Sequence, residues 1–229
     1  MHDPYLYPNT DILINKYGIK NERDLSEMEA EYTSIRIKQI TETPLQGNYD
    51  FEHFCRFHRW IFQDIYEWAG VPRTIDIEKA EPVLGGISIE YSAVNDIEPM
   101  AKKALENMRA IPWENLNLEE KAEKFSKCMA KLWKVHCFRE GNTRTVITFC
   151  CQFAESRGFP LDRTLFQKHS EYVRSSLVAA SACFSDLGDR SKPEYLIRIV
   201  RDSIERGQKQ SLIEGESSIH EIEDDWEHC

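Results

Sequence analysis

The sequence predicts an all-α domain that carries a single β-hairpin. Apolar residues recur at three- and four-residue spacing through most of the chain, which is typical of helices with one buried face. One segment, residues 74–91, instead alternates apolar and charged residues. No internal repeat and no Gly/Ser-rich linker divides the 229 residues, of which 41% are hydrophobic, so we expect one sizeable core.

Two helices are predicted before the hairpin. Residues 23–41 show one amphipathic pattern, and residues 49–68 show a second that is rich in aromatic side chains. The segment Ala-Gly-Val-Pro at 69–72 should end the second helix, because glycine and proline interrupt helices. The buried face of this helix is expected to consist of Phe54, Phe57, Ile61, Ile65 and Trp68.

The hairpin is predicted over residues 74–91. Ile75 and Ile77 alternate with charged residues, a Gly-Gly pair at 85–86 suits a turn, and alternation resumes after it. A two-stranded hairpin is marginally stable by itself, so this one should lean on the helices.

Five more helices are predicted, over residues 97–109, 117–136, 145–157, 162–183 and 192–208. Asn117 is a plausible N-cap, because Glu120 follows three residues later and completes a capping-box pattern. Gly158 suits the C-terminal cap of the helix that precedes it.

The acidity of the chain is concentrated at its C-terminus. Residues 214–229 contain seven acids and no Lys or Arg, so they supply most of the net charge of −10. The remainder is nearly balanced and shows no basic face of the kind that binds nucleic acid. From its composition we expect the tail to be solvated and mobile, with a partner-binding or autoinhibitory role as the alternative.

The chain is expected to be a cytoplasmic protein. No apolar run is long enough for a membrane span, and the N-terminus has no signal-peptide pattern. The seven cysteines are odd in number and irregularly spaced, which indicates reduced thiols and no disulfide framework.

The segment from His136 to Arg144 carries the chemistry. A predicted buried helix ends at His136, and an apolar helix starts directly after Arg144. Free N–H groups at a helix start, approached through Gly141, can bind an anion. Arg144 can donate to phosphate oxygens, Glu140 is a suitable ligand for phosphate-bound Mg²⁺, and His136 can remove a proton from an attacking hydroxyl.

These groups together favour phosphoryl- or nucleotidyl-group transfer. A lone histidine at a helix end is more often a core residue, but here base, carboxylate and arginine lie within nine residues. Zinc is not expected, because no His-Glu-x-x-His or Cys-x-x-Cys occurs and His53 and His58 do not share a helical face.

The same segment resembles the Fic-family signature His-Pro-Phe-x-Glu-Gly-Asn-Gly-Arg-x-x-Arg. The resemblance extends in order over residues 3–205, including the opening Asp-Pro-Tyr-Leu-Tyr-Pro and the stretch 62–70, Phe-Gln-Asp-Ile-Tyr-Glu-Trp-Ala-Gly. In the signature itself, six of the first eight fixed positions match: His136, Phe138, Glu140, Gly141, Asn142 and Arg144.

The resemblance implies an ATP-dependent protein adenylyltransferase with a helical Fic fold, in which residues 74–91 form the flap that aligns the target. His136 would be the catalytic base and Glu140 would hold Mg²⁺. The resemblance further implies a group that contacts the nucleotide phosphates: Gly141, Asn142, Thr143 and Arg144, with Lys79 of the flap beside the nucleotide or simply solvated.

Three positions depart from the family pattern. Cys137 replaces proline; a cysteine nucleophile is conceivable there, although packing is the favoured interpretation. Thr143 replaces glycine, so the loop should have an ordinary dihedral there, and its hydroxyl is expected to cap the next helix. Ile147 replaces the second arginine, which in the family grips the γ-phosphate and pairs with an inhibitory glutamate.

The resulting hypothesis is AMP transfer from ATP to a Ser, Thr or Tyr hydroxyl of a target protein. The alternatives are phosphoryl or other phosphate-group transfer, and a degenerate Fic fold that serves as a binding or toxin–antitoxin module. We expect an N-terminal helical extension (1–48), a core (49–208) and the acidic tail (209–229). A small antitoxin-like regulator is a further expectation, because neither the N-terminal helix nor Gln210–Gly215 carries the intact inhibitory pattern Ser/Thr-x-x-x-Glu-Gly/Asn.

Overall fold

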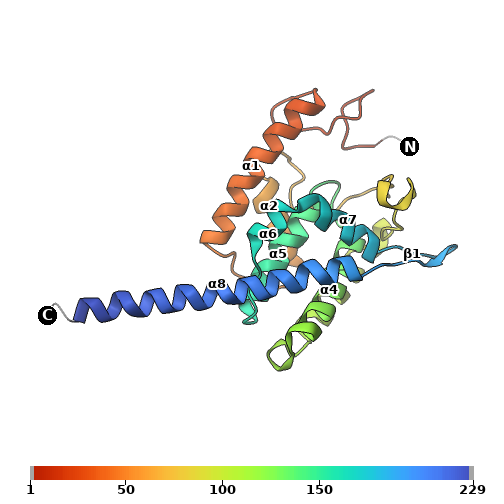
Figure 1. The fold of residues 1–229 in the computed structure, drawn as a ribbon. Helices are drawn as coiled ribbons and strands as arrows, with labels where there is room; N and C mark the ends of the chain where they lie inside the picture. Colours follow the sequence, from red (N-terminus) through yellow and green to blue (C-terminus); the bar gives the residue numbers. More distant parts are fainter. Residues whose placement is uncertain (1–2, 227–229) are drawn as a thin grey trace.

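The structure is a computed structural model that describes residues 3–226, with side chains as far as Ile213. It is predominantly helical, as predicted, and its helices pack around one core (Figure 1). The α-helices are α1 (Glu22–Glu42), α2 (Phe51–Phe62), α3 (Ile97–Arg109), α4 (Leu118–Val135), α5 (Asn142–Ser156), α6 (Arg163–Lys168), α7 (Ser170–Ala180) and α8 (Glu194–Trp226). Short 3-10 turns are η1 (Pro82–Leu84), η2 (Val94–Asp96) and η3 (Trp113–Asn115).

Helix α4 is the centre of the fold. It packs against α3, α5, α7 and α8, and its buried face includes Phe125, Met129 and Trp133. The predicted capping box starts it: the Asn117 side chain accepts from the Glu120 N–H, and the Glu120 carboxylate accepts from the Asn117 N–H. This fixes where the helix begins and therefore where its C-terminal end lies.

Helices α2 and α5 pack against each other through aromatic rings. Phe54 and Phe57 of α2 each contact Phe149 of α5 edge-to-face, with ring centroids 5.2 Å apart in both pairs. All three side chains are buried. The N-terminus of α5 is thereby held beside α2.

The prediction for residues 49–68 was wrong about where the helix ends. Helix α2 stops at Phe62, and the remaining residues form turns. The Ile65 carbonyl accepts from the N–H of Lys16 at 2.8 Å, so the chain leaves the helix to pair with the N-terminal segment. Ile65 is nevertheless buried as expected.

The predicted hairpin at 74–91 is also contradicted. This segment, hereafter the flap loop, contains no β-strand; it is an irregular loop around η1, drawn in yellow in Figure 1. Pro82 lacks an N–H, and the Lys79 N–H is taken by the Ser88 hydroxyl at 3.0 Å, so a regular ladder does not form. The β-strands in the described part of the chain are β1 (Cys183–Phe184) and β2 (Gly188–Asp189), which pair antiparallel.

These strands fall in and next to residues 162–183, which were predicted to be one helix. The structure instead places α6 and α7 there, with His169 between them, and then the small hairpin. Strand β2 begins at Gly188 with φ +73°, a conformation that glycine adopts without strain. The Asp-Leu-Gly sequence that leads into β2 is a turn signal that the helical pattern obscured.

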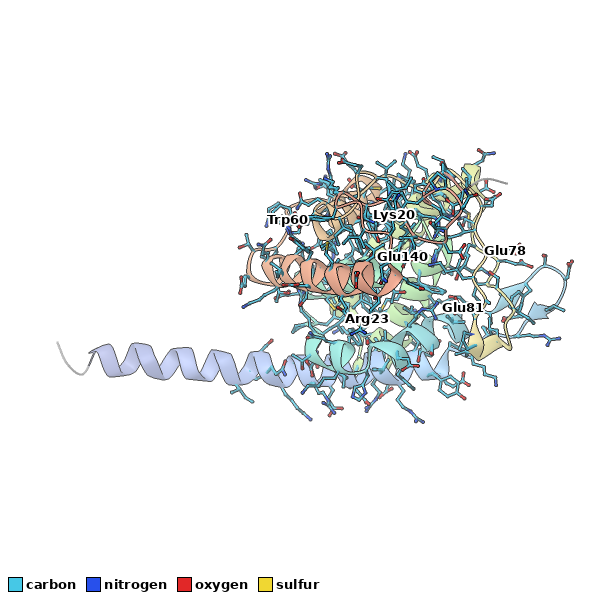
Figure 2. All side chains as sticks on the ribbon, turned by 90° about the horizontal axis from the view of Figure 1, so that it is seen from above. Lys20, Arg23, Trp60, Glu78, Glu81 and Glu140 are labelled. Atoms are coloured by element: carbon cyan, nitrogen blue, oxygen red, sulfur yellow. The ribbon has the colours of Figure 1, made fainter. Side chains whose placement is uncertain are left out.

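The described part of the tail that was expected to be solvated and mobile, residues 214–226, is helical. Helix α8 continues to Trp226, and its C-terminal half projects away from the other elements in both views (Figures 1 and 2). Extending an existing helix requires no new nucleation, so a polar segment can continue it. Residues 227–229 lie outside the described residues.

Candidate active site

His136 lies at the end of the buried helix α4, as predicted. It is the C-cap residue and has left-handed backbone angles, φ 51° and ψ 60°, which are uncommon for a residue other than glycine. The conformation is held by Arg73, whose Nε donates to the His136 carbonyl at 2.9 Å. The His136 side chain is only 4% exposed.

Arg73 is a site residue whose role the sequence did not reveal. Its guanidinium is buried and also donates to the carbonyls of Ile75, at 2.6 Å, and Ser92. Ile75 lies at the start of the flap loop and Ser92 directly follows it, so one side chain ties both ends of the loop to His136. Burial lowers the pKa of Arg73, although Asp76 opposes that effect.

Glu140 is held as an ionised carboxylate. Lys79 of the flap loop donates to its Oε2 at 2.9 Å, and the N–H of Gly141 donates to its Oε1 at 2.9 Å. Burial alone would raise its pKa, but Lys79, the Gly141 N–H and Arg144 together lower it to about 2. The Lys79 side chain is 26% exposed and is paired with Glu140, which Figure 2 labels, so Lys79 is not a freely solvated charge.

The loop after His136 is fixed by two further side chains. His58 lies beneath it: its Nδ1 accepts from the Gly70 N–H at 2.8 Å, so its Nε2 is protonated and donates to the Glu140 carbonyl at 3.0 Å. Its ring also stacks on Phe138, with centroids 3.8 Å apart. The sequence treated His58 only as a rejected zinc ligand, but the structure gives it the role of a support for the motif loop.

Asn142 acts in the same way. Its side-chain oxygen accepts from the Phe138 N–H at 2.9 Å, and its amide donates to the Phe138 carbonyl at 2.7 Å. The Asn142 side chain therefore bridges the two ends of this part of the loop. Gly141 precedes it with φ +79°, and a Cβ there would lie 2.2 Å from the Phe62 ring, so glycine is required on both counts.

Thr143 has an ordinary dihedral, as predicted, but does not cap helix α5. Its hydroxyl accepts a hydrogen bond from the Trp133 indole Nε1 at 2.9 Å. The buried Cys137 fits the packing interpretation, because burial raises the pKa of its thiol and keeps it protonated. Ile147 is half-buried beside the core.

Arg144 contacts the N-terminal helix α1. It pairs with the Glu29 carboxylate and donates to the Thr33 hydroxyl at 3.1 Å, and its guanidinium lies over the Phe62 ring, 4.9 Å from the centroid. Tyr66 donates to the same carboxylate. Glu29 was missed in the sequence; its spacing of four from Thr33 on one helical face is the signal that could have suggested it.

The assembled site brings the predicted residues together. His136, Glu140 and Arg144 surround the N-terminus of α5, and Lys79 reaches the same place from the flap loop. The first N–H groups of a helix have no intrahelical partner, so this terminus suits an anion. Within residues whose side chains the structure describes, no three His, Cys, Asp or Glu side chains form a metal cluster.

The site can therefore bind phosphate groups and hold a proton acceptor beside them. Burial, reinforced by Lys79, lowers the pKa of His136 well below its usual value, so the imidazole is neutral at neutral pH and can accept a proton. A carboxylate, an arginine and a helix N-terminus lie close by. This combination suits group transfer from a phosphate donor to a hydroxyl.

The comparisons with known proteins agree with this geometry. Residues 48–154 match the family model described as the Fic/DOC family. A protein of Sinorhizobium fredii named probable protein adenylyltransferase y4lH is 32% identical over 168 residues, which cover 72% of this chain and 81% of that protein. The protein adenylyltransferase VbhT of Bartonella schoenbuchensis is 30% identical over 77% of this chain, but the match spans only 35% of VbhT.

Solved structures show the same fold. The N-terminal Fic domain of a VirB-translocated effector protein from Bartonella quintana, solved with bound ADP, superposes with a TM-score of 0.70 at 25% identity, over 87% of this chain and 93% of that one. A second structure of such a domain from Bartonella quintana gives a TM-score of 0.69 at 26% identity, over 87% and 90% of the two chains.

Proposed function

Because the chain belongs to the Fic/DOC family, we propose that it transfers AMP from ATP to a hydroxyl side chain of a target protein. The observation that carries the proposal is the pairing of a neutral, buried His136 with an anion-binding helix N-terminus directly after it. The names of the relatives and the ADP bound to a similar domain support a nucleotide as the donor.

In the proposed reaction, His136 takes the proton from the target hydroxyl. The hydroxyl oxygen attacks the α-phosphorus of ATP, a new P–O bond forms, and the bond from the α-phosphorus to the bridging oxygen breaks to release pyrophosphate. The N–H groups at the start of α5 and the guanidinium of Arg144 stabilise the charge on the phosphates. Asn142 and His58 keep the loop in the shape that this requires.

Mg²⁺ fits the same site. The ion is usually bound through one or two carboxylates together with substrate phosphates and water, so a single ionised Glu140 is sufficient. Glu140 would hold the ion after exchanging its contact with Lys79, and the bound ion would neutralise charge on the phosphates. Lys79 would then be free to donate to a phosphate oxygen itself.

The flap loop is the part of the site that a target protein would meet. It carries Lys79 and is anchored at both ends by Arg73, so its position relative to His136 is fixed. We propose that a segment of the target lies along it and presents its hydroxyl to His136. A small antitoxin-like protein would regulate the site.

We also place the reaction in the cytoplasm. Six cysteines, from Cys55 to Cys183, are free thiols in the described part of the chain, which suits a reducing compartment. Among the described residues, no helix combines the length and the apolar character needed to cross a bilayer.

The test uses ATP labelled either at the α-phosphate or at the γ-phosphate. Each is incubated with the purified chain, Mg²⁺ and a bacterial lysate as the source of target proteins. Labelling is measured as the excess over the same lysate without the chain, because kinases of the lysate transfer the γ-label themselves. An excess of α-label alone supports AMP transfer. An excess of γ-label shows phosphoryl transfer by the chain and contradicts the proposal, and no excess of either label indicates a binding module.

A further inference from the structure

The imidazole of His136 has an unusual environment for a catalytic histidine. Neither of its ring nitrogens has a hydrogen-bond partner among the described residues, although the side chain is buried. A hydrogen bond to one ring nitrogen is the usual way to fix the orientation and tautomer of such a residue. Something else must orient this ring.

Two aromatic rings enclose it. The Tyr91 ring lies against the imidazole, with centroids 4.0 Å apart and an interplanar angle of 32°. The Trp133 ring meets it edge-on at 5.3 Å and 90°, and also contacts Tyr91 at 5.9 Å. We call these two rings the aromatic box of His136.

Tyr91 is fixed by an ion pair whose carboxylate is buried. Its hydroxyl donates to Glu81 Oε1 at 3.1 Å, and the Glu81 side chain is fully buried. Arg174 of α7 donates two hydrogen bonds to the same carboxylate, at 2.8 and 3.0 Å. A bidentate arginine–carboxylate pair is a strong and directional anchor, so α7 sets the position of a ring on the flap loop.

Trp133 is fixed by Thr143. The indole Nε1 donates to the threonine hydroxyl at 2.9 Å, across the turn that joins α4 to α5. Glycine, which stands here in the signature that the sequence resembles, has no side-chain acceptor. Threonine at position 143 therefore gives this chain an acceptor for the Trp133 indole that glycine could not provide.

We propose that Tyr91 and Trp133 are positioning residues for His136, and that Thr143 and the Glu81–Arg174 pair hold them in place. The inference rests on the proposed function in that the positioned imidazole is the base of the transfer. A base must present one nitrogen within hydrogen-bond reach of the attacking hydroxyl. Loss of the box should slow proton transfer and leave the ATP-binding residues unchanged.

The first test observes the box directly, without a target protein. In the full-length chain, the imidazole C–H resonance of His136 is assigned by its loss in His136→Asn, and the Trp133 indole N–H by its loss in Trp133→Phe. Thr143→Val removes the acceptor and keeps the side-chain shape, whereas Thr143→Ser retains the acceptor. Tyr91→Phe removes the contact to Glu81 and keeps the ring.

We expect an upfield-shifted His136 resonance in the unmodified chain. In Thr143→Val and in Tyr91→Phe the His136 resonance should move or broaden. In Thr143→Ser it should keep the position that it has in the unmodified chain. Trp133 should shift in Thr143→Val only. If both Thr143→Val and Tyr91→Phe melt normally and leave the His136 resonance unchanged, the proposal is wrong. Two independent variants are used so that the test can still be made if one of them fails to fold.

The second test uses the transfer reaction. With labelled ATP, Thr143→Val should lower kcat by about tenfold or more relative to Thr143→Ser, with KM for ATP similar in the two, because misplacement of a reacting group affects the chemical step. Equal kcat values would contradict the positioning role. If the unmodified chain transfers no AMP, the proposed function fails, while the resonance measurements still decide whether the box orients His136.

Discussion

At the scale of single residues, the site is built from groups that support other groups. Asn142 and His58 contact the backbone of the motif loop, Arg73 holds the carbonyl of His136, and Gly141 lets Phe62 approach. Few of these side chains are available to a ligand. The side chains available to contact ATP are the partly exposed charged ones of the site, above all Glu140.

Glu140→Gln is predicted to weaken Mg²⁺-dependent ATP binding by about tenfold or more, because a neutral amide is a poor ligand for this ion. Isothermal titration with ATP, with and without Mg²⁺, measures the effect. Glu123→Gln, on the exposed side of α4, is the matched control. Equal Mg²⁺-ATP affinity in both variants would remove Glu140 as the metal ligand.

The buried histidine His58 predicts a specific dependence of stability on pH. Burial lowers its pKa to about 3, whereas in the unfolded chain the pKa is about 6.5. Between these values the unfolded state binds the proton, so the free energy of unfolding falls as pH falls, by up to about 1.4 kcal/mol per pH unit for each such group. The pKa values of His136 and His53 are lowered in the same direction.

Denaturant unfolding at several pH values between about 5 and 6.5 measures this slope. His58→Gln should reduce it by about the contribution of one group, and the exposed His169→Gln serves as the control. If the free energy of unfolding depends on pH as steeply in His58→Gln as in the unmodified chain, His58 is not the buried neutral residue described above.

At the scale of elements, α1 is joined to the site through a charged contact. Glu29 is 13% exposed and pairs with Arg144, and Tyr66 donates to the same carboxylate. Glu27, on the same helix, forms an exposed pair with Arg23. Glu29 therefore makes a contact between two elements, whereas Glu27 makes a surface contact within one helix, so the pair allows the two kinds of contact to be compared.

Glu29→Ala is predicted to lower the free energy of unfolding by about 1–3 kcal/mol, because it leaves a partly buried arginine without its partner. Glu27→Ala should lower it by less than about 1 kcal/mol, since exposed pairs contribute little. Urea unfolding compares the two. Equal losses would mean that α1 is not held through Arg144.

The elements also show how much the sequence could predict. Helix α3 was predicted with its observed bounds, and the capping box at Asn117 located the start of α4, because both signals are local. The flap loop and the end of α2 were missed because they depend on specific partners: the Ser88 hydroxyl within the loop for the first, and the N-terminal Lys16 for the second. Local alternation and periodicity carry no information about such partners.

The residues of the site also divide into those that local sequence predicts and those that only the fold brings together. The motif placed His136, Glu140 and Arg144 together because they are adjacent in sequence and the loop is short. Arg73, Glu29 and the Glu81–Arg174 pair come from other elements, and only packing brings them to the motif. The motif also did not predict that the Asn142 amide donates to the Phe138 carbonyl within the loop.

At the scale of the whole molecule, helix α8 divides into a packed half and a projecting half. Buried residues occur on one face as far as Gly207, whereas Leu212 and Ile213 are 68% and 63% exposed. A chain truncated after Gln208 is predicted to keep its melting temperature within about 2 °C and its activity within a few-fold, because exposed residues contribute little to stability. Thermal melting and the labelled-ATP assay check this.

A large gain in activity on truncation, in a protein that melts normally, would contradict that prediction. It would show that the C-terminal half of α8 restrains the site. Glu214→Ala, whose side chain lies outside the described part, is the point variant that accompanies the truncation. A gain that appears in both would assign the restraint to this carboxylate.

The central claim is that His136 is the base for AMP transfer, and one measurement tests it most directly. The unmodified chain and His136→Ala are each incubated with Mg²⁺, lysate and ATP labelled at the α-phosphate, after circular dichroism has shown that both are folded. The account predicts strong labelling of protein by the unmodified chain and a loss of about 10²–10⁴-fold in the variant, the contribution expected of a general base. Labelling by a folded His136→Ala at the rate of the unmodified chain would contradict it.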